Sequence, residues 1–229
     1  MTDEARDKQI APRMSQFKWA EIPDLSEVGA EQRGWLVSFI LNATLRVDVP
    51  SPVRQQLFNF LRFAHQALSE YNAARDATNE FLESGRRELK YLDAIGHWEA
   101  VLAYSCQALG FIGGGQKIWF TKGDDTAIER LYSLHNRVKH ANTAIARGEF
   151  GDESPLCVWL SNDGLVSTKQ QLSWAELVDV LTCIAKLAAA AQDPLTMREK
   201  LSDWDGSWSH LDSAPQMVAS AFRSTISSS

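Results

Sequence analysis

Apolar side chains recur every three or four residues along most of this chain, the spacing that places them on one face of an α-helix. Five stretches show this pattern, and turn-forming or helix-ending residues separate them. The pattern predicts helices over about 24–50, 51–84, 86–112, 126–148 and 173–193. Asp24 or Ser26 is expected to open the first helix. Four of the helices have about 20 residues or more, which favours up-and-down packing in a bundle.

Two of the predicted helices begin with a capping box, in which two side chains accept hydrogen bonds from each other's backbone N–H. Thr126 with Glu129 matches the pattern at the fourth helix, and Ser173 with Glu176 matches it at the fifth. The fourth helix is expected to continue to Gly148. Its apolar face is predicted to consist of Ile128, Leu131, Leu134, Val138, Ala141 and Ile145.

The periodicity changes between the fourth and fifth predicted helices. Residues 156–160 and 165–168 are rich in apolar and β-branched side chains, and Asn162-Asp163-Gly164 stands between them. Asp-Gly supplies the positive φ values that a tight hairpin turn requires. The chain is therefore predicted to be an all-α, up-and-down bundle of about five main helices with a small β-hairpin insertion near 155–170.

Three units are expected along the chain. Residues 1–24 form a polar lead-in, and residues 25–194 form the helical bundle domain. Residues 195–229 form a C-terminal extension with weak periodicity, which includes Trp204 and Trp208. The few apolar residues of the lead-in are expected to contact the bundle, namely Met14, Phe17, Trp19 and Ile22.

Composition narrows the class of protein. The 229 residues are 45% hydrophobic and 23% charged, as in ordinary globular domains. Lys and Arg number 23 against 29 Asp and Glu, so the net charge of −6 argues against a general nucleic-acid coat protein, although it leaves room for a local basic site. The N-terminus lacks a signal-peptide apolar stretch, and no apolar run approaches the roughly 20 residues that span a bilayer. A cytoplasmic protein with no membrane partner is expected.

Cysteine, histidine and glycine spacings give no sign of a metal or cofactor site. CxxC and HExxH are both absent, and the three cysteines are expected to be free thiols. The glycine-rich stretch 110–117 departs from a phosphate-binding loop because no Gly-Lys-Ser/Thr follows its glycines. No metal and no cofactor are expected. The cysteines are Cys106, Cys157 and Cys183.

One stretch of the fourth predicted helix has unusual chemistry for an acidic protein. Residues 130–142 contain two Arg, one Lys, two His and two Asn. At about 100° per residue, Asn136 and His140 share a face away from the apolar stripe, Arg147 joins them a further turn on, and His135 lies at the stripe's edge. Packing within this helix's own core does not explain Asn136 and His140. They are expected to face solvent, a cleft or a second subunit.

The segment His135-Asn136-Arg137-Val138-Lys139-His140 resembles the signature of HEPN domains. These are helical bundles in which a late helix carries an Arg, often followed by a polar residue, and then a His four to six residues on. The resemblance covers about 51–148, and it includes the order of two long helices followed by a motif helix. In catalytic members the motif implies metal-independent RNA cleavage at a homodimer interface.

Two registers of the motif are open. In the first, Asn136 is the polar residue and His140 the motif His, and His135 then stands where the family has Arg. In the second, Arg130 and His135 are the pair, and Leu131 occupies the polar position. An imidazole lacks the bidentate fork of Arg, so the first register implies weaker phosphate clamping.

The resemblance implies roles for individual residues. His140 is the candidate general acid and base, because a His titrates near working pH, and Asn136 is its orienting partner. His135 completes the candidate catalytic set. The candidate RNA-phosphate contacts are Arg130, Arg137, Lys139 and Arg147.

Two functions follow, and both stay open at this point. One is a catalytically silent HEPN-like binding or scaffold module in a bacterial-type defence or signalling system. The other is a metal-independent endoribonuclease, a toxin or antiviral effector, that acts as a homodimer. His135 at the Arg position and the net charge of −6 favour the first, whereas the basic cluster favours the second. The expected partners are a second copy of the chain, another protein, or RNA.

Overall fold

The computed structural model describes residues 2–18, 21–28, 32–45, 51–112, 119–149 and 155–193. Within these ranges the chain forms seven α-helices, one short 3-10 helix and three β-strands. The helices are α1 (Asp3–Gln9), η1 (Met14–Gln16), α2 (Gln32–Leu45), α3 (Ser51–Glu83), α4 (Glu88–Phe111), α5 (Ala127–Lys139), α6 (Ala141–Ala146) and α7 (Trp174–Ala191). The strands are β1 (Trp159–Ser161), β2 (Gly164–Val166) and β3 (Gln171–Ser173). The predicted helical character with a small β insertion is confirmed.

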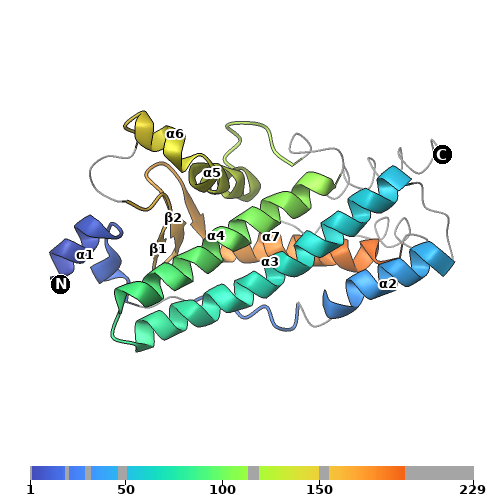
Figure 1. The fold of residues 1–229 in the computed structure, drawn as a ribbon, viewed down its shortest axis with the longest axis horizontal. Helices are drawn as coiled ribbons and strands as arrows, with labels where there is room; N and C mark the ends of the chain where they lie inside the picture. Colours follow the sequence, from blue (N-terminus) through green and yellow to red (C-terminus); the bar gives the residue numbers. More distant parts are fainter. Residues whose placement is uncertain are drawn as a thin grey trace.

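Helices α3 and α4 form the long antiparallel pair at the centre of the molecule (Figure 1). Gly85 (φ 73°) and Arg86 (φ 64°) turn the chain between them in the left-handed region, where glycine is favoured. Helix α7 packs against both, and α2 lies along α3 and α7. The Asn42 side chain of α2 donates to the Gln192 carbonyl at the end of α7 (3.1 Å).

An aromatic cluster joins the three central helices. The Trp98 ring of α4 packs edge-on against Tyr71 of α3, with 5.4 Å between ring centroids. The Trp98 ring also packs against Trp174, the first residue of α7, with 4.8 Å between ring centroids. The Trp98 indole N–H donates to the Thr78 hydroxyl (2.9 Å), so this buried polar group is satisfied. The core therefore fixes the start of α7, which follows directly on the sheet.

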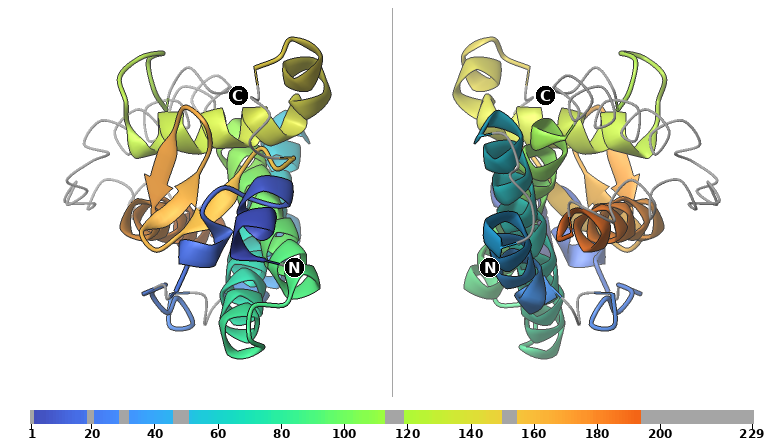
Figure 2. Two further views of the ribbon diagram at one scale, coloured as in Figure 1. Left: turned by 90° about the vertical axis from the view of Figure 1, so that its left-hand side faces the viewer. Right: turned by 90° about the vertical axis from the view of Figure 1, so that its right-hand side faces the viewer.

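The β insertion is a three-stranded antiparallel sheet in the order β1-β2-β3, rather than a single hairpin. The predicted hairpin corresponds to β1 and β2, with Asn162 and Asp163 in the turn. The third strand, β3, was not predicted, because it is only three residues long and its last residue, Ser173, is also the N-cap of α7. Figure 2 shows the sheet between α5 and α7, and β3 contacts both helices.

The first predicted helix begins later than expected. Asp24 accepts a hydrogen bond from the Ser26 N–H (2.8 Å) and so closes a turn, whereas α2 begins at Gln32. The apolar residues of the lead-in join the core: Met14, Phe17 and Ile22 are buried, and Phe17 stacks on Phe81 at 6.0 Å. Trp19 and the predicted extension 195–229, with Trp204 and Trp208, lie outside the described residues. No helix in the described ranges has the length and apolarity needed to cross a bilayer.

Candidate functional site

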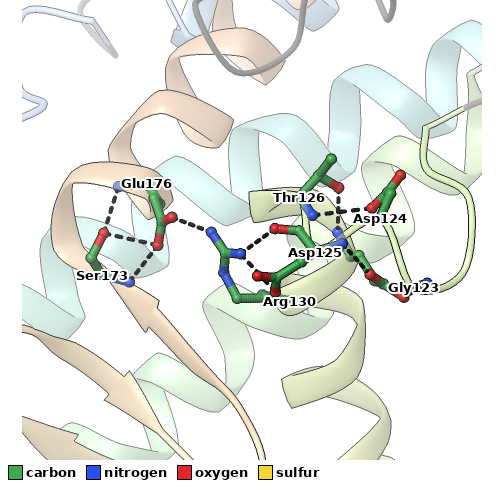
Figure 3. A network of polar contacts seen from close by, with 8 residues as sticks. Gly123, Asp124, Asp125, Thr126, Arg130, Ser173 and Glu176 are labelled. Atoms are coloured by element: carbon green, nitrogen blue, oxygen red, sulfur yellow. Dashed lines mark hydrogen bonds and ion pairs between the residues drawn. The ribbon is translucent and has the colours of Figure 1, made fainter.

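The site begins with the way α5 starts. The Thr126 hydroxyl accepts from the Glu129 N–H (3.2 Å), which is one half of the predicted capping box. The other half is absent, because Asp124 takes the Thr126 N–H (3.0 Å) and the Glu129 carboxylate instead accepts from the N–H groups of Gly123 and Asp125 (Figure 3). Acidic side chains at this end of α5 also stabilise the helix through their interaction with its macrodipole. Helix α5 is thus fixed at its N-terminus by its own preceding loop.

The predicted helix 126–148 is broken at His140. Helix α5 ends at Lys139, His140 leaves the helical region (φ −110°, ψ 23°), and the short α6 begins at Ala141. The expected apolar face was therefore wrong beyond the break: Ile145 is 56% exposed, and Ala144 is buried in its place. The break and the left-handed Gly148 (φ 66°) let the chain turn back, so that Glu149 meets Arg137.

An open groove of about 530 Å³ lies beside this break, and we name it the α5–α6 groove. Its lining includes four of the residues singled out in the sequence and two charged residues that were not. These are Asn136, Arg137, His140, Arg147, Glu149 and Lys169. Both Asn136 and His140 are exposed, and the His140 N–H still donates to the Asn136 carbonyl (2.9 Å). The pair therefore keeps its one-turn spacing despite the break.

The charged groups of the groove differ in how firmly they are held. Arg137 is only 10% exposed, and its guanidinium pairs with Glu149 (3.0 Å) and donates to the Thr168 hydroxyl (3.2 Å). Arg147 is 71% exposed and lies 3.9 Å from the other Glu149 oxygen, and Lys169 is exposed. Three cations against one carboxylate leave the groove positive in an otherwise acidic protein.

Arg130 lies away from the groove and joins two helices (Figure 3). It is 17% exposed and pairs with Asp125 (2.9 Å) and with Glu176 at the start of α7. Burial opposes ionisation of Glu176, but hydrogen bonds from Ser173 and the charge of Arg130 outweigh it and hold the pKa of Glu176 below its usual range. Ser173 and Glu176 form the predicted capping box in full. Arg130 thus connects α5 to the capped end of α7.

His135 and Lys139 also lie outside the residues that line the groove. His135 is half-buried. Its burial, and then electrostatic interactions with Lys139 and His140, lower the pKa of the His135 imidazole. His135 is therefore neutral near pH 7. The structure brings together Asn136 and His140 of the first register, and it separates Arg130 from them.

Several lining residues were missed in the sequence for different reasons. Ser133 and Thr143 also line the groove, and their spacing of three from Asn136 and from His140 was a usable signal. Glu149 and Lys169 come from a turn after α6 and from the turn between β2 and β3. No helical periodicity connects these turns to α5, so only the tertiary fold reveals them.

In the described ranges, no group of three or more His, Cys, Asp or Glu side chains converges. The three cysteines are free and buried. Burial raises the pKa of each thiol, which keeps all three in the unreactive protonated form.

No family model, no curated protein and no solved structure matches this chain.

Proposed function

We propose that the chain is an HEPN-like binding module whose α5–α6 groove holds the phosphate backbone of RNA, and that it serves a defence or signalling system without cutting that RNA. The supporting observation is the convergence of Arg137, Arg147 and Lys169 with Asn136 and His140 on one open groove. The three cations come from α5, from the end of α6 and from the sheet.

Cationic side chains at the edge of a groove suit a phosphate backbone because they replace condensed counterions. Arg147 and Lys169 are exposed and can turn toward a ligand. Arg137 is held by Glu149 and Thr168, so it contributes a fixed charge. Asn136 and His140 add hydrogen-bonding groups that lie one helical turn apart.

Binding without cleavage is favoured by the small number of groups suited to proton transfer. Cleavage through the 2′-hydroxyl requires one group to remove a proton and one to protonate the leaving oxygen. Within the described residues His140 is the one imidazole that lines the groove, and His135 stands aside. The Glu149 carboxylate also lies within the groove, where it repels phosphate and offsets Arg137.

Metal-independent RNA cleavage is the second candidate function. The observation that favours it is the exposure of His140 beside Asn136 in a positive groove. A second copy of the chain, joined groove to groove, would bring a second His140 and so supply the missing proton-transfer group.

Fluorescence anisotropy with a labelled single-stranded RNA tests the proposal. We expect binding that weakens with added salt, and we expect Lys169→Ala and Arg147→Ala each to weaken it severalfold and to reduce its salt dependence. Lys122→Ala is the matched control, because Lys122 is exposed in the loop before α5, at the other end of that helix. The proposal would be refuted if the RNA showed no salt-dependent binding, or if Lys122→Ala lost as much affinity as Lys169→Ala and Arg147→Ala.

Gel analysis of the same RNA, incubated with the protein in EDTA, separates the two functions. Intact RNA with the wild-type protein supports the binding module. Cleavage that disappears in His140→Ala would instead establish the nuclease.

A further inference from the structure

A second cavity, of about 560 Å³, lies between the N-terminal segment and the sheet, and we name it the sheet cavity. Figure 2 shows the N-terminal helices beside the strands, and η1 contacts β1. Its lining includes Arg13, Trp159, Asn162, Thr168 and Gln171. The function proposed above makes no use of this cavity.

The floor of the cavity is one face of the three-stranded sheet. Leu160, Leu165 and Leu172 pair across the strands and are buried, and of these three only Leu160 lines the cavity. Because side chains alternate along a strand, the neighbouring set points the other way. That set consists of Trp159, Val166 and Gln171, which pair across β1, β2 and β3 and all line the cavity.

Trp159 differs from the other described tryptophans of the sheet and core. The indole N–H groups of Trp98, Trp119 and Trp174 each donate to an acceptor. The Trp159 N–H has no acceptor among the described residues and, unlike that of Trp35, is not sealed from solvent. It is thus a free donor on an aromatic ring at the cavity wall.

Polar groups share the lining of the cavity with this ring. Asn162 uses its side-chain oxygen to accept from the Lys18 N–H (3.2 Å), which leaves its NH₂ group without a partner among the described residues. Thr168 and Gln171 are exposed, and the lining also holds one cation, Arg13, and one carboxylate, Asp163. A ligand with a flat ring and several hydrogen-bonding atoms fits this lining.

An added β-strand fits the cavity less well. The edge strand β1 has little free backbone to offer, since the Leu160 N–H already donates to the Tyr91 hydroxyl (3.0 Å). Recognition of a peptide by strand addition depends on such free backbone groups.

The sheet cavity and the α5–α6 groove meet at the turn between β2 and β3. Thr168 lines the cavity, and its hydroxyl accepts from Arg137, which lines the groove. The next residue, Lys169, lines the groove. The turn itself is held by the hydrogen bond from the Ser167 N–H to the Gln170 carbonyl (2.8 Å). A linear polymer that lies along the α5–α6 groove would reach the sheet cavity by crossing the turn between β2 and β3.

We propose that the sheet cavity binds a nucleobase of the single-stranded RNA whose phosphates the α5–α6 groove holds, an inference that rests on the proposed function. Every base has an aromatic face that stacks on a tryptophan or packs against its edge. The edge of the base would meet the Trp159 N–H and the amides of Asn162 and Gln171. Recognition of unstacked bases in this way is typical of single-stranded RNA.

The test compares two labelled oligomers of about 12 nucleotides, one an ordinary single-stranded RNA and one the same ribose-phosphate chain without bases. We expect the RNA to bind about tenfold more tightly than the abasic chain. Trp159→Leu should remove most of that difference and leave the affinity for the abasic chain unchanged. Lys169→Ala should weaken both oligomers.

The outcomes separate the two proposals. If neither oligomer binds, the proposed function fails. If both bind equally, the phosphate groove stands and the base site is overturned. Trp159 is nearly buried, so a crosslinking measurement on the wild-type protein covers the case in which Trp159→Leu unfolds. RNA containing 4-thiouridine should crosslink to the cavity residues, and crosslinks confined to other parts of the chain would overturn the inference.

Discussion

The Arg137 guanidinium and the Glu149 carboxylate meet across the break between α5 and α6, with 3.0 Å between Nη1 and Oε2. A continuous helix would carry residue 149 about 18 Å along its axis from residue 137, so the ion pair depends on the turn at His140 and Gly148. The same turn creates the α5–α6 groove and places a carboxylate inside it.

Glu149→Gln is expected to strengthen RNA binding. The substitution removes the negative charge of the groove and keeps an oxygen that can accept from Arg137. Two exposed charges about 4 Å apart interact by about 1 kcal/mol in water, which corresponds to about a fivefold gain in affinity at low salt. Anisotropy with single-stranded RNA measures it, with Glu83→Gln, exposed at the end of α3, as control. A loss of affinity would mean that Glu149 acts mainly by holding Arg137 in place.

Gly164→Ala is expected to destabilise the fold. A Cβ at this position would lie 2.1 Å from the Leu172 carbonyl oxygen and 2.7 Å from the Ser173 Cα, and both are backbone atoms that cannot swing aside. Such crowding costs about 1–3 kcal/mol. The matched control is Gly110→Ala in α4, where an added Cβ would meet nothing within 4 Å beyond its chain neighbours and the backbone of its own helix, and it is expected to be neutral or slightly stabilising. Urea unfolding followed by circular dichroism gives both values, and equal midpoints would contradict the prediction.

Arg130→Met should lower the free energy of unfolding by about 1–2 kcal/mol without changing RNA affinity. The substitution keeps much of the packing but leaves the partly buried Glu176 without its cation. A much larger effect of the variant on RNA binding than on stability would show instead that Arg130 contacts the ligand.

The stability of the wild-type protein should fall as the pH drops from 7 toward 5, in part because of His135. Its pKa is lower in the folded chain than the value of about 6.5 in the unfolded chain, so the unfolded state takes up a proton first. Above about pH 6.5 this contribution no longer changes with pH. Urea unfolding of His135→Gln should show a shallower decline over the same range. An NMR titration in which the His135 ring has a pKa at or above 6.5 would contradict the prediction.

The parts of this fold that depend on neighbouring residues could be read from the sequence, whereas those that depend on distant residues could not. The Ser173–Glu176 capping box and the long helices α3, α4 and α7 follow from local spacing. The break at His140 does not, because the apolar spacing continues through it to Ile145. The turn is favoured by the contact between Glu149 and Arg137, which lies twelve positions earlier in the sequence.

The candidate site shows the same division. Asn136 and His140 were placed on one face by their spacing, and the structure keeps them together. Arg130 belongs to the same short basic stretch, but Glu176, which binds it, lies 46 residues further along. Lys169 was missed because it reaches the groove from the sheet. The density of charged residues along the sequence therefore indicated the region of the candidate site. It did not distinguish Arg130, which joins two helices, from the cations that line the groove.

Trp174 follows directly on β3 and is the first residue of α7. Two contacts of its side chain provide an intrinsic spectroscopic probe of the protein. Its indole N–H donates to the Asn162 carbonyl at the turn between β1 and β2 (3.0 Å), while its ring lies 4.8 Å from Trp98 in the core. Two indoles at that separation couple their electronic transitions. A ligand that shifts Asn162 therefore alters the near-ultraviolet circular dichroism of the buried Trp98–Trp174 pair. Binding in the sheet cavity can thus be followed without an attached dye.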